Sequence, residues 1–139
     1  LKYTIHDLIP DIDARFKIYN GGPVEQDNLY FIHNRPDLIS NSTEISNGIY
    51  WGGDFESTKR LINEGKISKN NIRFFLGYTG WDEKQLESEM ENNSWIITTN
   101  SYENKIIGKS ATHFWKEQIM ELGGDYLIWS NAPENPYLN

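Results

Sequence analysis

The residues of this sequence that could do chemistry are its histidines and carboxylates, and their spacing does not assemble a catalytic group. His6, His33 and His113 lie far apart, and none has a second ligand at a metal-site spacing such as HxxxH. His33 ends an expected strand, where it is either a solvated side chain or a group that faces a pocket. The absence of cysteine excludes a thiol nucleophile and a disulfide scaffold. We therefore expect no catalytic residue, no metal and no cofactor.

Three glutamates on one expected helix have a spacing that could serve acid–base chemistry. Glu83, Glu87 and Glu91 recur every four residues and so share a helix face. Paired carboxylates catalyse glycoside hydrolysis, but a solvated stripe opposite Leu86 and Met90 explains the same spacing. The pattern favours the solvated stripe.

Two stretches share one pattern, in which a strand runs into glycines and then into a helix that begins at an aspartate. The first contains Gly52, Gly53 and Asp54, and the second runs from Gly77 to Asp82. Free amides at helix N-termini favour anions, but both caps are carboxylates that already accept from those amides. Each junction is therefore either a simple turn between a strand and a helix or a ligand site. Neither matches the Walker or GxGxxG patterns.

A third glycine-rich turn, Gly21-Gly22-Pro23-Val24, is either a tight turn or an anion-binding nest from which Pro23 removes one donor. Glycine allows backbone to approach backbone or ligand where a Cβ would intrude. We expect the three glycine segments to meet around one concave surface that also presents Tyr78, Trp81 and Gln85. The candidate residues for binding a ligand or partner are Gly21, Gly22, Pro23, His33, Gly52, Gly53, Asp54, Gly77, Tyr78, Gly80, Trp81 and Gln85.

Length and charge bear on the number of domains and on the classes of partner that the protein can bind. The chain has 139 residues, which suits one domain, and carries a net charge of −7. Its lysines and arginines are scattered with no run of three, so direct binding of nucleic acid is disfavoured. No apolar stretch has the roughly 18 residues that a membrane helix needs. These features predict a cytoplasmic protein without membrane attachment.

Hydrophobic periodicity and capping residues predict strands interrupted by single helices, which indicates an α+β fold. Asn47-Gly48 marks a hairpin, and Asp82 with Gln85 has the spacing of a capping box. Helices are expected over 5–9, 55–64, from 82 onward and over 111–122. Strands are expected over 15–19, 29–33, 43–46, 49–51, 72–78, 95–99 and 126–129, followed by an irregular tail over 131–139.

Several segments carry a family resemblance, namely 21–24, 29–33, 48–54 and 75–81, the last of which continues to Gln85-Leu86-Glu87 and Trp95. Together they resemble the AlgH (YqgE) family of bacterial proteins. The ending over 131–136 resembles the branch found in Bacteroidetes. The chain departs from the family at Glu83-Lys84, where members usually have Pro-Gly. The resemblance implies a branched mixed sheet curled into a pseudo-barrel with flanking helices. No enzymatic activity or cofactor is established for the family.

Family members carry a further N-terminal segment with strands, so the chain is expected to be a single AlgH-like domain over 1–139 that lacks them. Unpaired sheet edges would then favour self-association. The combined expectation is a non-catalytic protein with an indirect regulatory role, which binds a small molecule or a protein partner. The alternatives are a DNA-binding transcriptional regulator, as the family is often labelled, and a hydrolase that uses His33 or a junction aspartate.

Overall fold

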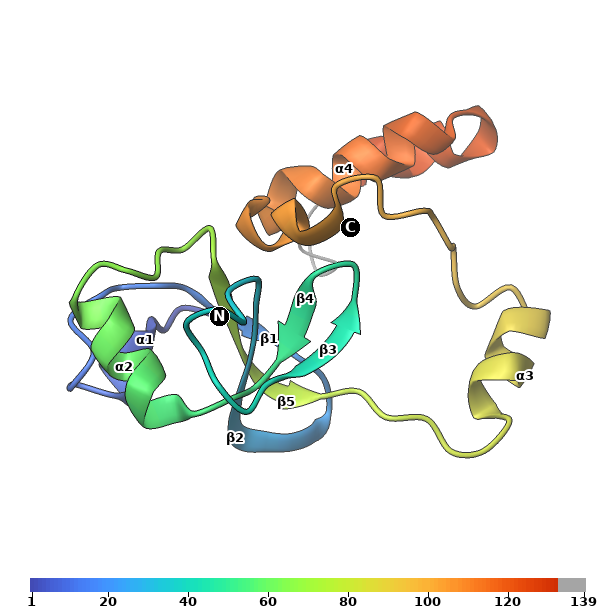
Figure 1. Cartoon of the computed structure of the whole chain (residues 1–139). Helices are drawn as coiled ribbons and strands as arrows, with labels where there is room; N and C mark the ends of the chain where they lie inside the picture. Colours follow the sequence, from blue (N-terminus) through green and yellow to red (C-terminus); the bar gives the residue numbers. More distant parts are fainter. Residues whose placement is uncertain (133–139) are drawn as a thin grey trace. The chain divides into compact units, whose positions relative to one another are not determined.

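A five-stranded mixed sheet organises the first part of the chain (Figure 1). The computed structural model describes residues 1–132, apart from the side chains of residues 111 and 112. The strands are β1 (Ile18–Asn20), β2 (Val24–His33), β3 (Thr43–Ser46), β4 (Ile49–Trp51) and β5 (Ile72–Tyr78). Their order in the sheet is β1-β5-β2-β4-β3; β1 runs parallel to β5, and the other pairs are antiparallel.

The sheet is curled but open. The pairing of β2 with β5 shifts register between Val24 and Leu29, where Glu25 has a φ of 48°. An irregularity of this kind bends a strand and increases its twist. The edges of the sheet are β1 and β3, so it does not close into a barrel. The predicted α+β class, with a curled mixed sheet and flanking helices, is confirmed.

The two faces of the sheet differ in burial. Ile18, Phe74 and Phe31 form one row across β1, β5 and β2, and all three are buried. The next row, Tyr19, Phe75 and Tyr30, points to the opposite face because side chains alternate along a strand, and it is only half-buried. One face therefore builds the core, and the other is an aromatic surface that water partly reaches.

Two helices cover the core face. Helix α1 (Ile5–Leu8) buries Ile5, and α2 (Phe55–Asn63) buries Leu61 and Ile62 in the same core cluster as Phe74. Burying each such side chain contributes about 1.5–3 kcal/mol. Asn63 joins the end of α2 to the loop after α1, because its Nδ2 donates to the Asp11 carbonyl at 2.7 Å. Figure 1 shows the two helices side by side.

Residues after β5 form helix α3 (Gln85–Glu91) and the 3-10 helix η1 (Glu103–Gly108). Helix α3 starts three residues later than expected, since Lys84 at its N-cap has a φ of 63°. Half of the expected capping box remains, with the Asp82 amide donating to Gln85 Oε1 at 3.0 Å. The strand expected over 95–99 is wrong, because this segment has no regular structure and no strand partner.

The chain divides after Gly108, and the second compact unit holds α4 (Ala111–Leu122) and η2 (Gly124–Asn131). Helix α4 matches its predicted bounds, and of its apolar side chains Ile119 is buried while Trp115 and Leu122 are exposed. The strand expected over 126–129 is wrong, because these residues lie in η2. The predicted tail extends beyond the described residues. Across residues 1–132, no helix combines the length and apolar character needed to cross a bilayer.

Candidate functional site

The end of β5 carries a shallow cavity on the aromatic face of the sheet, which we call the strand-end hollow. Its volume is about 340 Å³. Tyr30 packs beside it, with ring centroids 5.4 Å from Trp51 and 5.5 Å from Tyr78. Gly77 has a φ of 71°, which interrupts the alternation of β5 just before Tyr78. The residues that line the hollow are Asn20, Gly21, Ile32, Trp51, Phe75, Gly77, Tyr78 and Thr79.

Glycines at this hollow let two backbone segments touch. A Cβ on Gly21 would lie 2.0 Å from the Gly77 carbonyl oxygen, and one on Gly22 would lie 2.3 Å from the Tyr78 carbonyl oxygen. Such contacts are too close for any side chain. Asn20 Oδ1 accepts from the Gly22 amide at 3.2 Å, so that amide is already used. The turn thus serves backbone packing, and Pro23 beside it is exposed.

The second glycine junction lies between β4 and α2. Asp54 caps α2, and its Oδ2 accepts from the Ser57 amide at 3.2 Å. Hydrogen bonds from Ser57 hold the pKa of Asp54 below its usual value. A Cβ on Gly53 would lie 2.5 Å from Ile39 Cγ2, whereas one on Gly52 would meet open space. Gly53 therefore fits a closely packed turn, and Asp54 is engaged as a cap.

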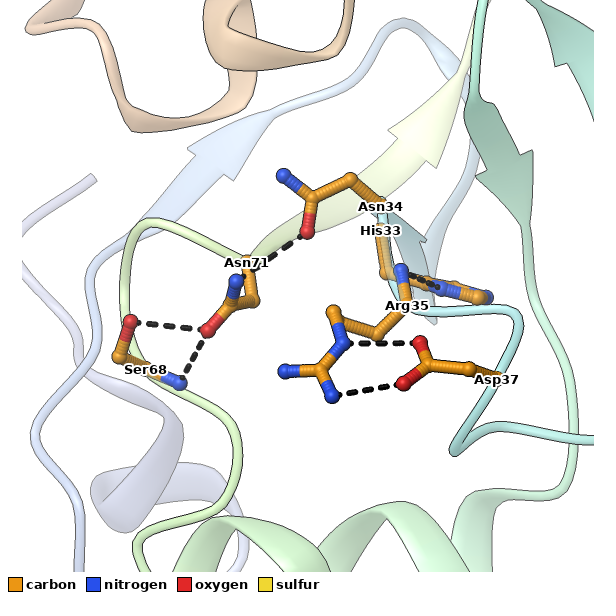
Figure 2. A network of polar contacts seen from close by, with 6 residues as sticks. All are labelled: His33, Asn34, Arg35, Asp37, Ser68 and Asn71. Atoms are coloured by element: carbon orange, nitrogen blue, oxygen red, sulfur yellow. Dashed lines mark hydrogen bonds and ion pairs between the residues drawn. The ribbon is translucent and has the colours of Figure 1, made fainter.

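His33 is fully buried, which corrects the expectation of a solvated or pocket-facing side chain. Its Nδ1 accepts from the Arg35 amide at 3.0 Å, as Figure 2 shows. Its Nε2 lies 3.0 Å from the Gly52 carbonyl oxygen, so the neutral tautomer protonated at Nε2 satisfies both ring nitrogens. Burial lowers the pKa of His33, which keeps the ring neutral. A ring closed off in this way has no nitrogen left to act as a base.

Polar contacts near His33 join the residue that follows β2 to the residue that precedes β5 (Figure 2). Asn71 donates to Asn34 Oδ1 at 3.2 Å and accepts from the Ser68 amide at 3.0 Å. Arg35 donates from Nε and Nη2 to the two carboxylate oxygens of Asp37, at 2.8 and 2.7 Å. Such a bidentate pair fixes the loop that follows β2. These hydrogen bonds hold strands and loops together, so the polar groups that make them are already engaged within the protein.

A different kind of site surrounds α3. Glu89 Oε2 accepts from Trp81 Nε1 at 3.0 Å and from Trp95 Nε1 at 2.7 Å. Its other oxygen accepts from Gln85 Nε2 at 2.8 Å. These three hydrogen bonds lower the pKa of Glu89 and keep it charged. One carboxylate therefore fixes two indole rings, whose centroids are 5.8 Å apart at an angle of 64°.

The fixed rings border an exposed apolar cavity of about 610 Å³, which we call the Trp groove. Leu86 and Met90 lie one helical turn apart and are 41% and 39% exposed. Helix α3 buries no residue, so these side chains do not belong to the core. The residues that line the Trp groove are Trp81, Leu86, Glu87, Met90, Glu91, Trp95, Ile96 and Ile97.

The structure separates the residues that we expected to meet around one surface. Gly21, Gly77 and Tyr78 line the strand-end hollow, with Gly22 packed behind it. Trp81 lines the Trp groove, and Gln85 holds the carboxylate behind it. His33 bonds to Gly52 next to Gly53 and Asp54, and none of these four residues lines either cavity. Gly80 lies between the two surfaces, where an added Cβ would only touch the Tyr78 ring.

The sequence reasoning missed Glu89 and the apolar residues after α3. Glu89 follows Gln85 by four residues, a spacing that predicts contact on a helix. The run Trp95-Ile96-Ile97 was expected to be part of a strand, whereas these side chains lie outside regular structure and are 48%, 50% and 66% exposed. Exposed apolar residues clustered beside a helix are a signal for an interaction surface.

No group of three histidine, aspartate or glutamate side chains within residues 1–132 is arranged to hold a metal ion. Every buried side-chain nitrogen and oxygen in the same part of the chain has a hydrogen-bond partner. The site chemistry of this region therefore rests on exposed aromatic and aliphatic groups, with carboxylates around them.

The curled, open sheet defines a fold that solved bacterial structures share. Protein DIP2367 from Corynebacterium diphtheriae superposes with a TM-score of 0.70 at 15% identity, covering 95% of this chain and 71% of that one. The AlgH protein from Pseudomonas aeruginosa superposes with a TM-score of 0.63 at 22% identity, covering 94% and 70%. At these identities the similarity shows the fold alone.

The family model described as AlgH-like matches residues 1–127, and the chain belongs to this family. The UPF0301 protein of Cytophaga hutchinsonii is 44% identical over 138 residues, which cover 98% of this chain and 75% of the relative. That of Chlorobium limicola is 42% identical over 127 residues, covering 91% and 67%. That of Parabacteroides distasonis is 40% identical over 123 residues, covering 88% and 62%. The chain thus spans between 62% and 75% of the length of these relatives.

Proposed function

We propose that this chain is a non-catalytic binding protein with an indirect regulatory role, and that it recognises a protein partner through the Trp groove. The hydrogen bonds from two indoles to Glu89 carry this proposal, because they fix the rings before any partner arrives. Preorganised aromatic side chains reduce the entropy lost on binding, and tryptophan dominates the energetics of many interfaces. The proposal accounts for apolar side chains that the fold leaves exposed.

A small-molecule site is the second candidate, and the strand-end hollow supports it. Trp51, Phe75 and Tyr78 present aromatic surface there, beside the backbone of Gly21 and Gly77. A planar apolar molecule would suit such rings. The hollow has about half the volume of the Trp groove, at about 340 Å³ against about 610 Å³. We therefore place the principal binding surface at the Trp groove.

The two alternatives have less support. A hydrolase that used His33 would need an accessible ring nitrogen, whereas both are hydrogen-bonded inside the protein. A DNA-binding regulator would need a basic surface to neutralise phosphates, and the chain has a net charge of −7. Gel-shift titration at low salt tests this alternative, and tight, sequence-dependent binding would favour it.

The experiment for the proposed function uses a fluorescein-labelled helical peptide of about 18 residues, with leucine and phenylalanine on one face and glutamine on the other. Fluorescence anisotropy follows its binding to the chain. We expect Trp81→Ala and Trp95→Ala each to weaken binding about tenfold or more. Trp51→Ala, at the strand-end hollow, is the matched control and should leave binding unchanged. No binding, or a loss confined to Trp51→Ala, would contradict the proposal.

A further inference from the structure

The polar side chains that line the Trp groove are both acidic. Glu87 and Glu91 border it together with Leu86 and Met90. Successive helix positions turn by about 100°, so the stripe of Leu86 and Met90 lies between that of Gln85 and Glu89 and that of Glu87 and Glu91. The glutamates expected opposite the apolar stripe therefore lie next to it. The groove has tryptophan on one side, aliphatic side chains at its base and carboxylates on the other side.

Negative charge is concentrated in this segment. Between Trp81 and Ile97 five carboxylates stand against the single lysine Lys84, giving a net charge of −4 out of −7 for the whole chain. Glu87 and Glu91 are one turn apart, where like charges repel. No ion pair among the described residues engages either of them. A cation placed between them would relieve that repulsion.

We propose that the Trp groove binds a basic amphipathic helix of a partner protein, an inference that rests on the function proposed above. The apolar face of that helix would cover Leu86, Met90 and the two indoles. Lysines or arginines along its flank, one turn apart, would meet Glu87 and Glu91. Tryptophan faces at the border favour the same charge through cation–π attraction. The occupant is thus defined by both shape and charge.

Charge also decides between this occupant and two others. In a twofold contact with a second copy, the groove meets a surface with the same excess of carboxylates, which offers a single lysine between Trp81 and Ile97 to pair with Glu87 and Glu91. Phosphate-rich surfaces, whether anionic lipid or nucleic acid, carry the same sign as the groove. Opposite charges across an interface instead raise the association rate and reject wrong partners. The groove therefore selects a cationic protein segment.

The test compares three labelled peptides that share one apolar face and carry lysine, glutamine or glutamate on the other. We expect affinity for the chain to fall in that order, with lysine at least tenfold tighter than glutamate. The double variant Glu87→Gln with Glu91→Gln should weaken the lysine peptide about threefold to tenfold and leave the glutamine peptide unchanged. Raising the salt concentration should weaken the lysine peptide alone.

The matched control is Glu117→Gln with Glu121→Gln, an exposed pair on α4 with the same spacing and the same change in net charge. It should leave the affinity for the lysine peptide unchanged. Equal affinities for all three peptides, with the loss in Trp81→Ala retained, would overturn this inference and keep the proposed function. The inference also fails if the control weakens binding as much as the groove variant. A dimer in sedimentation that Trp81→Ala dissolves would identify a second copy as the occupant and overturn it as well.

Discussion

The core face of the sheet, which α1 and α2 cover, and the Trp groove contain the same types of residue but differ in burial. Around Phe74 the apolar side chains are buried and the polar groups nearby, including His33, are closed by internal hydrogen bonds. Around α3 the apolar side chains are exposed, and polar Glu89 holds two of them in place. The first region therefore stabilises the fold, and the second is the surface to which we assign partner binding in our proposal.

The largest expected loss of stability, and the first test of this comparison, concerns Phe74. It is fully buried, and its ring centroid is 5.8 Å from that of Phe31. We expect Phe74→Ala to lower the free energy of unfolding by about 3–5 kcal/mol, because it removes packing and leaves a cavity. Leu86→Ala should change it by less than about 1 kcal/mol, since Leu86 is 41% exposed. Urea denaturation measures both, and equal losses would show that Leu86 is part of the core.

A smaller loss is expected from His33→Ala. The substitution leaves the Arg35 amide and the Gly52 carbonyl without their partner inside the protein, at a cost of about 2–4 kcal/mol. His113→Ala, which changes an exposed histidine, should be close to neutral. If His33 instead faced solvent, both substitutions would be harmless in the same denaturation experiment.

His33 also predicts a pH dependence. Its pKa in the folded chain is lowered by burial from the 6.5 of a free imidazole. Between these two values the unfolded chain binds more protons, so the free energy of unfolding falls as the pH drops below 6.5. The part of this slope that His33 contributes should vanish in His33→Ala and persist in His113→Ala. A native profile without any fall below that pH would contradict the buried neutral ring.

The smallest difference concerns two glycines with positive φ. A Cβ on Gly77 would lie 2.6 Å from the Gly22 carbonyl oxygen, whereas a Cβ on Gly52 would meet open space. Gly52→Ala should therefore cost only the conformational strain, about 1 kcal/mol, and Gly77→Ala about 2 kcal/mol or more. Thermal unfolding separates them. Equal costs would mean that the strand-end hollow is not built by close backbone contact.

Much of the fold could be predicted because local signals agreed with the tertiary structure. Asn47-Gly48 joins β3 to β4 at the predicted bounds, and β5 and α4 also match theirs. The prediction from sequence was wrong where an apolar run can form either a strand or an exposed segment outside the sheet. Trp95-Ile96-Ile97 has the composition of a strand, but strand formation depends on a partner that composition does not reveal. The strand predicted over residues 126–129 was wrong for the same reason.

The candidate site was predictable only in part. Tyr78 and Gly21 share a cavity as expected, but Trp81 lies in another, because the chain leaves the sheet after β5. The acidic spacing of Glu87 and Glu91 was visible, and so was the stripe of Leu86 and Met90. Their joint exposure was not visible, because periodicity gives the faces of a helix and not what covers them.

The indole N–H signals of the chain test the central claim most directly. The chain has five tryptophans, and Trp→Phe variants assign their signals in a ¹H–¹⁵N correlation spectrum. On addition of the lysine peptide, we expect the signals of Trp81 and Trp95 to shift together while that of Trp51 stays in place. Shifts confined to Trp51, or no shift at any tryptophan, would contradict the assignment of the Trp groove as the binding surface.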